Sequence, residues 1–284
     1  MRIVIVGCSG FVGTELKAFF EASGDEVRGV KVREESRVET LSAEFEGVDV
    51  LINLAGLSIF WRWSKAYKEL LYNSRVLTTR KLVKAMQGCK NRPKRFISTS
   101  AVGIYPNDIR CDEECSELSN SFLAHICKDW EKEAFKAEKM GIVTTVFRCG
   151  IVLGKEGGML QKMWLAFSLG LGGRIGSGKQ PLSWVHKDDL CRAYKKVIGD
   201  ESLKGVYNLC APQSTTNLEL TKTLGRIMHR PTPFPVHEWL LRLIFAEGAE
   251  FMLEGQNVYP KRLLEAGFEF KYRDIETALR SFLS

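Results

Sequence analysis

The amino-acid sequence predicts an α/β fold in which a doubly wound parallel sheet is followed by a smaller, mainly helical C-terminal lobe. Short apolar runs alternate with helical patterns over the first 154 residues, and this alternation is typical of parallel strands joined by helices. Beyond residue 154, glycine-rich segments and prolines interrupt the alternation. We therefore expect a core domain at residues 1–154. Residues 155–284 should supply the remaining sheet elements and the C-terminal lobe, with the two parts partly interleaved.

The expected strands and helices follow one another along the chain. Strands are expected at residues 2–6, 26–32, 48–54, 95–100 and 143–153, with a late strand at residues 205–210. Helical patterns cover residues 11–22, 65–86 and 121–140. The first strand (RIVIV) is almost entirely apolar, as is usual for a strand with both faces buried. Residues 143–153 are rich in β-branched side chains, which favour strands.

The composition is that of an ordinary globular protein, with 45% apolar and 26% charged residues. The net charge of +7 suits anionic ligands such as nucleotide phosphates. The longest basic cluster, at residues 90–95, precedes a strand and has the pattern of a solvated turn, so no nucleic-acid partner is expected. No apolar run approaches the roughly 18 to 20 residues that span a membrane, and no signal peptide is recognised.

Eight cysteines are scattered along the chain without a CxxC pair or a matching histidine cluster. This pattern predicts no metal site. Several of these cysteines lie beside apolar residues in expected strands or helices. We therefore interpret them as reduced, mostly buried thiols of a cytoplasmic protein.

A glycine-rich turn of the form GxxGxxG joins the first strand to the first helix. Gly7 and Gly10 would let the chain turn tightly and bring backbone N–H groups close to a diphosphate, and Gly13 would let the helix pack against the sheet. The helix N-terminus adds partial positive charge. At the first strand–helix junction of an alternating chain, this turn predicts a Rossmann-type dinucleotide site.

The end of the second strand distinguishes NADP(H) from NAD(H). An acidic residue there would bind the ribose 2′-hydroxyl of NAD. This chain has Arg33 at that point, with Glu34 and Glu35 beyond it. Arg33 would bind a 2′-phosphate or stack on adenine; the alternative is an arginine that only faces solvent. We expect NADP(H) rather than NAD(H).

Two further strand ends point to the same edge of the sheet. Asn53, Leu54, Ala55 and Gly56 lie at the end of the third strand, where the small residues Ala55 and Gly56 let the backbone pass close to a cofactor. Ser100 ends the fourth strand at the carboxyl edge, where open α/β sheets bind ligands. Ser100 is a candidate hydrogen-bond donor to substrate or nicotinamide; capping the next segment is the competing role.

Taken together, these motifs resemble the extended, or atypical, short-chain dehydrogenase/reductase superfamily, and within it the nucleoside-diphosphate-sugar epimerase-like group. The resemblance spans the whole chain and includes the segments at residues 7–13, 53–56, 74–75, 100–105, 130–131, 148–154, 183–190 and 253–256. It implies an NADP(H)-binding core and a C-terminal lobe that closes over a substrate cleft. It also implies that the cofactor is lined by Gly7, Ser9, Gly10, Phe11, Val12, Gly13, Arg33, Leu54, Ala55, Gly56 and Arg75, with Gly150, Ile151 and Val152 beside the nicotinamide. By the same resemblance, His186 and Asp189 belong to the cleft wall, although His186 also suits a purely structural role.

The chain departs from this superfamily at the residues that usually carry its chemistry. Working members use a Tyr and a Lys, eight and four residues before a Glu, to move a proton while hydride moves at the nicotinamide. Counting back from Glu131 gives Cys127 and Leu123, which cannot do this. Tyr105, Lys128 or His186 could replace the pair. Cys127 is either a redox-active thiol or an inert buried cysteine.

Three functional classes remain from the sequence alone. The first is an NADP(H)-dependent oxidoreductase or epimerase (an isomerase) that acts on a small molecule such as a sugar nucleotide. The second is a catalytically silent NADP(H)-binding sensor or partner-binding protein, as the missing Tyr/Lys pair would suggest. The third, a nucleic-acid or division-associated binder, has only the basic charge balance behind it. We expect a monomer or homodimer.

Overall fold

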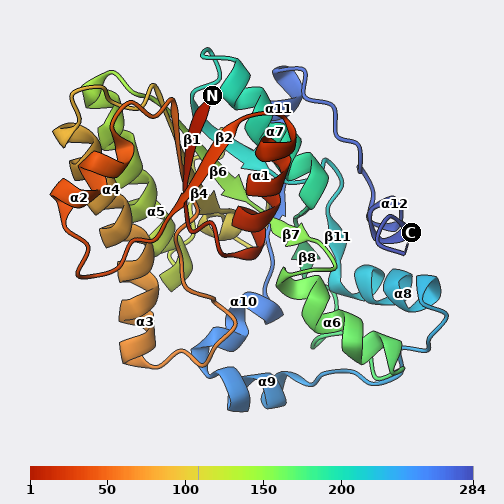
Figure 1. The fold of residues 1–284 in the computed structure, drawn as a ribbon. Helices are drawn as coiled ribbons and strands as arrows, with labels where there is room; N and C mark the ends of the chain where they lie inside the picture. Colours follow the sequence, from red (N-terminus) through yellow and green to blue (C-terminus); the bar gives the residue numbers. More distant parts are fainter. Residues whose placement is uncertain (108, 284) are drawn as a thin grey trace.

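The computed structural model describes residues 1–107 and 109–283, and its centre is a six-stranded sheet (Figure 1). The strands lie in the order β10-β6-β4-β3-β1-β2, and every neighbouring pair is parallel. Their bounds are β1 Arg2–Val6, β2 Glu26–Val30, β3 Val50–Asn53, β4 Arg95–Ala101, β6 Val143–Cys149 and β10 Gly205–Leu209. This topology confirms the predicted Rossmann-type doubly wound sheet. The chain starts at β1, next to the edge strand β2, and after β2 it crosses back over β1 to β3 and continues outward to β10 at the other edge.

Helices cover both faces of the sheet. One face carries α1 (Phe11–Ala22) and α7 (Lys187–Gly199), and the other carries α2 (Val38–Phe45), α4 (Thr78–Gly88) and α5 (Phe122–Ala134) (Figure 1). Alternate residues of a strand point to opposite faces. Accordingly, Ile3 and Ile5 pack with the first pair of helices, while Val4 and Val6 pack with the second set.

Two predicted elements are interrupted. The helical stretch at residues 65–86 consists of α3 (Lys65–Tyr72), a π-helical turn (Asn73–Leu77) and α4. The predicted strand at residues 143–153 breaks at Gly150, where a Cβ would lie 2.6 Å from the carbonyl oxygen of Ser183. After this break, β7 (Ile151–Leu153) leaves the main sheet and pairs with β9 (Trp184–His186).

The C-terminal lobe has its own hydrophobic core, which includes Leu160, Trp184, Leu224 and Leu279. Its helices are α6 (Gly158–Ser168), α8 (Asn217–Ile227), α9 (Glu238–Phe245), α10 (Glu250–Leu253), α11 (Lys261–Glu265) and α12 (Ile275–Arg280), and its remaining short strands are β8 (Pro181–Leu182), β11 (Thr215–Thr216) and β12 (Asn257–Val258), the last paired with β5 (Arg110–Cys111). Short 3₁₀ helices cover Val102–Ile104, Phe135–Met140 and Glu247–Ala249. Among the described residues, no helix has the length and apolar character needed to cross a membrane.

Candidate dinucleotide site

The turn between β1 and α1 has the geometry that the glycine pattern predicts. Gly7 has a φ of +85°, and a Cβ there would lie 2.9 Å from the backbone of Leu54. A Cβ on Gly13 would lie 2.5 Å from the carbonyl oxygen of Gly7. Gly10 precedes the first residue of α1 and supplies no side-chain cap. The backbone N–H groups of the first helical turn therefore remain open to a ligand such as a diphosphate.

The segments that follow β3 and β6 converge on this turn. Val12, Leu54 and Val152 all pack against one hydrophobic cluster. Asn53, which is fully buried, holds the chain after β3 because its side-chain oxygen accepts from Ala55 N at 3.1 Å. The structure thus brings most of the residues predicted to line a cofactor to one edge of the sheet.

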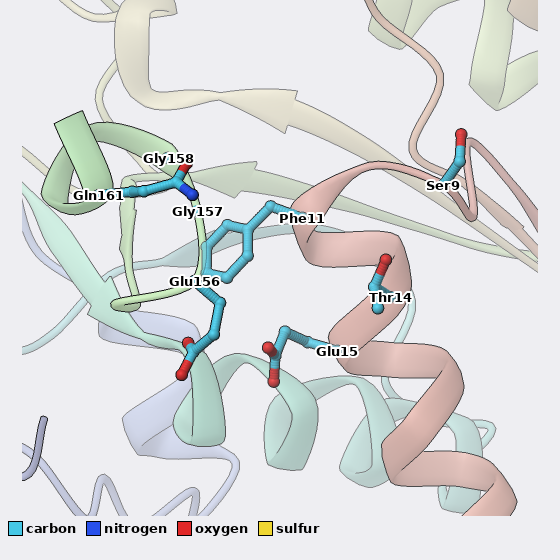
Figure 2. Close-up of a pocket in the computed structure, with 8 residues that line it drawn as sticks. All are labelled: Ser9, Phe11, Thr14, Glu15, Glu156, Gly157, Gly158 and Gln161. Carbon is cyan, nitrogen blue, oxygen red and sulfur yellow. The ribbon is translucent and has the colours of Figure 1, made fainter.

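A pocket of about 350 Å³ lies beside the turn (Figure 2). On one side it is lined by residues of the turn and α1, among them Phe11 and Glu15, and on the other by the 156–161 segment, including Glu156. Phe11 packs so closely on this segment that a Cβ at Gly157 would lie 2.3 Å from the ring. Lys187 Nζ joins the two sides, at 3.3 Å from Glu15 and 2.9 Å from Glu156. The two carboxylates disfavour a phosphate inside this pocket.

Arg33 lies beyond the end of β2 on an exposed loop. Its side chain is 70% exposed, and its nearest charged partner is Glu35 at 3.6 Å. The loop is held by Lys81 Nζ, which donates to the carbonyl oxygens of Arg33 (3.0 Å) and Glu34 (2.6 Å). The guanidinium is therefore free to meet a phosphate, and Lys81 is a second cation nearby that the sequence did not single out.

Ser100 and Tyr105 belong to one buried hydrogen-bond network. Ser100 Oγ donates to Glu131 Oε1 at 2.7 Å, and Arg148 binds both oxygens of Glu131 at 2.9 and 2.8 Å. Arg148 also donates to the Tyr105 hydroxyl at 2.8 Å, and that hydroxyl donates to Asn208 at 2.9 Å. The network joins the ends of β4, β6 and β10 to α5. Of its members, the sequence singled out only Ser100 and Tyr105 as candidates for chemistry.

Tyr105 is fully buried, and its environment disfavours proton transfer. Burial raises the pKa of its hydroxyl to about 12, although Arg148 acts in the opposite direction. The hydroxyl hydrogen of Tyr105 is already donated to Asn208 Oδ1. The candidate role of Tyr105 as proton donor therefore gains no support from its contacts. Ser100, at the carboxyl end of β4, is also buried and donates its hydroxyl hydrogen to Glu131, so its candidate role as a donor to a ligand gains no support from its contacts either.

His186 lies apart from this network. Its ring is 2% exposed and stacks on Tyr272 at 3.7 Å and on Phe282 at 4.7 Å between ring centroids. Nδ1 accepts from Asp188 N at 3.0 Å and so caps α7, and Nε2 bonds to Ser281 Oγ at 3.0 Å. Burial lowers the pKa of the imidazole to about 4. These contacts favour a purely structural role for His186, in which it links the C-terminal segment to α7.

Asp189 makes the same connection. It is fully buried, and its carboxylate accepts from Lys271 N at 2.9 Å and Tyr272 N at 2.8 Å. Burial raises the pKa of this carboxyl group, although the two backbone hydrogen bonds act in the opposite direction. Through these contacts Asp189 holds the backbone at residues 271–272 against the start of α7.

Helix α5 carries no Tyr/Lys pair at the usual positions, as the sequence predicts. Cys127 is buried, and burial raises the pKa of its thiol to about 11, so it is not a reactive thiolate near neutral pH. Leu123 packs against the cluster that contains Trp63 and Trp130. Within residues 1–107 and 109–283, no group of three His, Cys, Asp or Glu side chains is placed to hold a metal ion.

Comparisons with known proteins agree with this fold and turn. Residues 3–210 match the model of the NAD dependent epimerase/dehydratase family, and residues 236–282 match a domain of unknown function, DUF1731. The chain is 35% identical over 303 aligned residues to the chloroplastic epimerase family protein SDR39U1 homolog of Arabidopsis thaliana, covering 100% of this chain and 87% of that protein. It is 34% identical over 299 aligned residues to epimerase family protein YfhF of Bacillus subtilis, covering 100% and 98%.

A solved structure supports the same assignment. The crystal structure of human epimerase family protein SDR39U1 (isoform 2) with NADPH superposes with a TM-score of 0.91 at 31% identity, covering 99% of each chain. The glycine turn, the parallel sheet and the family match over 3–210 lead to one conclusion: this chain belongs to the NAD dependent epimerase/dehydratase family.

Proposed function

We propose that the protein binds NADP(H) along the carboxyl edge of its sheet and acts as an oxidoreductase or epimerase on a small molecule held between the core and the C-terminal lobe. In this proposal the amides of the β1–α1 turn bind the diphosphate. Leu54, Ala55 and Gly56 line the adenosine side, and residues 150–152 line the nicotinamide side. Arg33, with Lys81 nearby, would bind the 2′-phosphate.

The observation that carries this proposal is the uncapped start of α1. Gly10 leaves the first N–H groups of the helix without a side-chain acceptor, and the close approach of Gly7 to Leu54 leaves room for backbone only. Such a helix start favours a phosphate group. The human relative with a TM-score of 0.91 was crystallised with NADPH, which supports the choice of cofactor.

Calorimetric titration with NADPH and NADH tests the binding part of this proposal. We expect NADPH to bind about tenfold or more tightly than NADH, because one charge-assisted contact to a phosphate contributes about 1.5–3 kcal/mol. The catalytic part is tested with a panel of carbonyl compounds and sugar nucleotides, by following NADPH oxidation or product formation. Lack of affinity for either nucleotide would remove the proposal altogether.

A second function, a catalytically silent NADP(H)-binding sensor, is favoured by one specific observation. The positions of the usual acid–base pair hold Leu123 and Cys127, and the Tyr105 hydroxyl is buried and already engaged. Tight NADPH binding without turnover of any panel member would favour the sensor. Turnover that is lost in Ser100→Ala while NADPH affinity is kept would favour the enzyme.

A further inference from the structure

Two cysteine side chains meet at the turn that follows β5. Cys111 is the last residue of β5, Cys115 closes the turn, and their Sγ atoms are 2.9 Å apart. Among the eight cysteines, all of which lie in the described part of the chain, no other pair of sulfurs is joined by a hydrogen bond. A disulfide bond joins its sulfurs at about 2.05 Å. A small movement of either side chain would therefore bring this pair to bonding distance.

Backbone hydrogen bonds hold the two sulfurs together. Cys115 N donates to Asp112 O at 3.2 Å, and Glu114 N donates to the Asp112 carboxylate at 2.8 Å. On the other side of the turn, Cys111 belongs to the strand pair β5–β12, and its carbonyl oxygen accepts from Tyr259 N at 2.8 Å. Because the folded turn already positions both cysteines, closing a ring between them would cost little further chain entropy.

The two thiols differ in their access to solvent. Cys111 is 1% exposed, whereas Cys115 is partly exposed. The S–H group of Cys115 donates to Glu117 O at 3.4 Å, which leaves the S–H group of Cys111 to donate between the two sulfurs. Burial and this hydrogen bond raise the pKa of the Cys111 thiol to about 12. A reagent from solvent would therefore meet Cys115 first, and Cys111 would react second.

The same turn fastens the C-terminal lobe to the core. Glu113 accepts from Asn208 N, at the end of β10, at 2.8 Å, and from Arg262 N, in α11, at 3.4 Å. Glu114 forms an ion pair with Lys261, which is also in α11. A covalent bond between the two sulfurs would close the turn into a ring and limit the motion of the carboxylates that hold α11.

We propose that Cys111 and Cys115 form a redox modification site, at which a small disulfide compound oxidises the two thiols to an intrachain disulfide bond. The Cys115 thiolate attacks one sulfur of the compound, the S–S bond of the compound breaks, and the first thiol leaves with a proton. The Cys111 sulfur then gives up its proton and attacks Cys115 Sγ, and the second thiol leaves. The protein loses two electrons and two protons, and these reduce the compound to two thiols.

The experiment exposes the full folded chain to increasing hydroxyethyl disulfide, an uncharged oxidant, at a fixed concentration of mercaptoethanol. After acid quenching and alkylation of the remaining thiols, a protease that cleaves after glutamate cuts at Glu113 or Glu114, between the two cysteines. We expect the two fragments to stay joined until they are reduced. Half-oxidation of the folded chain should need at least about tenfold less oxidant than half-oxidation of the same pair in urea, because the fold preorganises the pair.

Three variants serve as controls. Cys111→Ser and Cys115→Ser should each abolish the joined fragments. Cys89→Ser removes a buried thiol whose hydrogen bonds go to backbone carbonyls, and it should leave the joined fragments unchanged. If Cys111→Ser unfolds at a lower temperature, Cys115→Ser decides alone, because the Cys115 side chain is partly exposed.

Amide hydrogen exchange tests the effect on the lobe. We expect oxidation to slow exchange at residues 257–262 by about twofold or more in wild type, and to leave it unchanged in Cys115→Ser. Unchanged exchange in oxidised wild type would overturn the effect on the lobe.

Three other results would overturn the site itself: no joined fragments from folded wild type, an equal need for oxidant in the folded and unfolded chains, and a mercaptoethanol adduct on Cys115 that never forms the ring. None of these measurements involves NADPH, so failure of the proposed function would be recognised separately.

Discussion

Arg33 is the residue on which the choice between the two nicotinamide cofactors depends. Its exposed guanidinium lies just beyond β2 and is weakly engaged with Glu35 at 3.6 Å. We predict that Arg33→Ala weakens NADPH binding about tenfold or more, because a charge-assisted contact with a phosphate contributes about 1.5–3 kcal/mol. NADH has no 2′-phosphate, so its affinity should stay within about twofold.

Arg37→Ala is the matched control, since it removes the same charge from the same exposed loop. It should leave both affinities unchanged, as measured by calorimetry at one fixed salt concentration. Equal weakening of NADPH and NADH by Arg33→Ala would show that Arg33 does not contact the 2′-phosphate.

His186 makes the stability of the protein depend on pH. Burial holds its pKa at about 4 in the folded protein, whereas an unfolded histidine titrates near 6.5. Between these values the unfolded chain binds more protons than the folded one. The free energy of unfolding should therefore fall as the pH drops from about 6.5 toward 4, with His186 contributing up to about 1.4 kcal/mol per pH unit.

His186→Asn isolates this contribution because asparagine can still cap α7. Urea unfolding of both proteins at several pH values would give the difference in slope. Parallel stability curves for wild type and His186→Asn between pH 4 and 6.5 would contradict the buried, neutral state of the imidazole.

At the residue scale, the sequence predicted correctly those features that depend on neighbouring residues alone. Gly7, Gly10 and Gly13 could be assigned from their spacing, because each glycine answers to a backbone constraint within the turn or at its neighbouring strand. The surroundings of Tyr105 and His186 could not. Their partners, such as Asn208 and Tyr272, are distant in the sequence. The spacing of apolar residues does not indicate which distant side chains will be in contact in the folded protein.

At the scale of elements, the packing of α1 on the sheet depends on Gly13. A Cβ there would lie 2.5 Å from the Gly7 carbonyl oxygen, which is backbone and cannot move aside cheaply. We predict that Gly13→Ala lowers the free energy of unfolding by about 1–3 kcal/mol, the usual cost of overpacking. Urea denaturation measures this change.

Gly199→Ala provides the contrast. A Cβ at Gly199 would meet nothing within 4 Å, and alanine in a helix is favoured over glycine by about 0.5–1 kcal/mol. The second variant should therefore be at least as stable as wild type. A Gly13→Ala protein that matches Gly199→Ala in stability would refute the close-packing role of Gly13.

The strands of the sheet were predictable because their apolar runs are buried on both faces. The interruptions were not. The π turn at Asn73–Leu77 contains no Gly or Pro that would mark an interruption, and the break at Gly150 depends on the carbonyl of Ser183, which is distant in the sequence. Helix α2 was also not anticipated; it is only eight residues long, and only Leu41 and Phe45 in it are buried.

At the scale of the whole molecule, the doubly wound parallel sheet was predicted from the alternation of strands and helices, whereas the contacts of the C-terminal lobe were not. The lobe touches the core through pairs such as Phe11 with Gly157, and Asp189 with the backbone of Lys271. These contacts join segments that are far apart in sequence. They place the segment before α6 against the start of α1, and residues 271–272 against the start of α7.

In this arrangement of core and lobe, the open backbone amides at the start of α1 are proposed to bind the cofactor diphosphate. Gly10→Asp tests it directly. The backbone at Gly10 is extended (φ −79°, ψ 166°), and a Cβ would meet only the Gly7 carbonyl oxygen at 3.4 Å, so the fold should accept a side chain. Aspartate is a favoured N-cap, and its carboxylate would occupy the amides and repel a diphosphate.

We predict that calorimetry detects NADPH binding to the wild-type protein and at least about a hundredfold weaker binding to Gly10→Asp, a difference of about 2.7 kcal/mol. Thermal stability of the variant should equal or exceed that of wild type. A stable Gly10→Asp protein that binds NADPH with wild-type affinity would contradict the account.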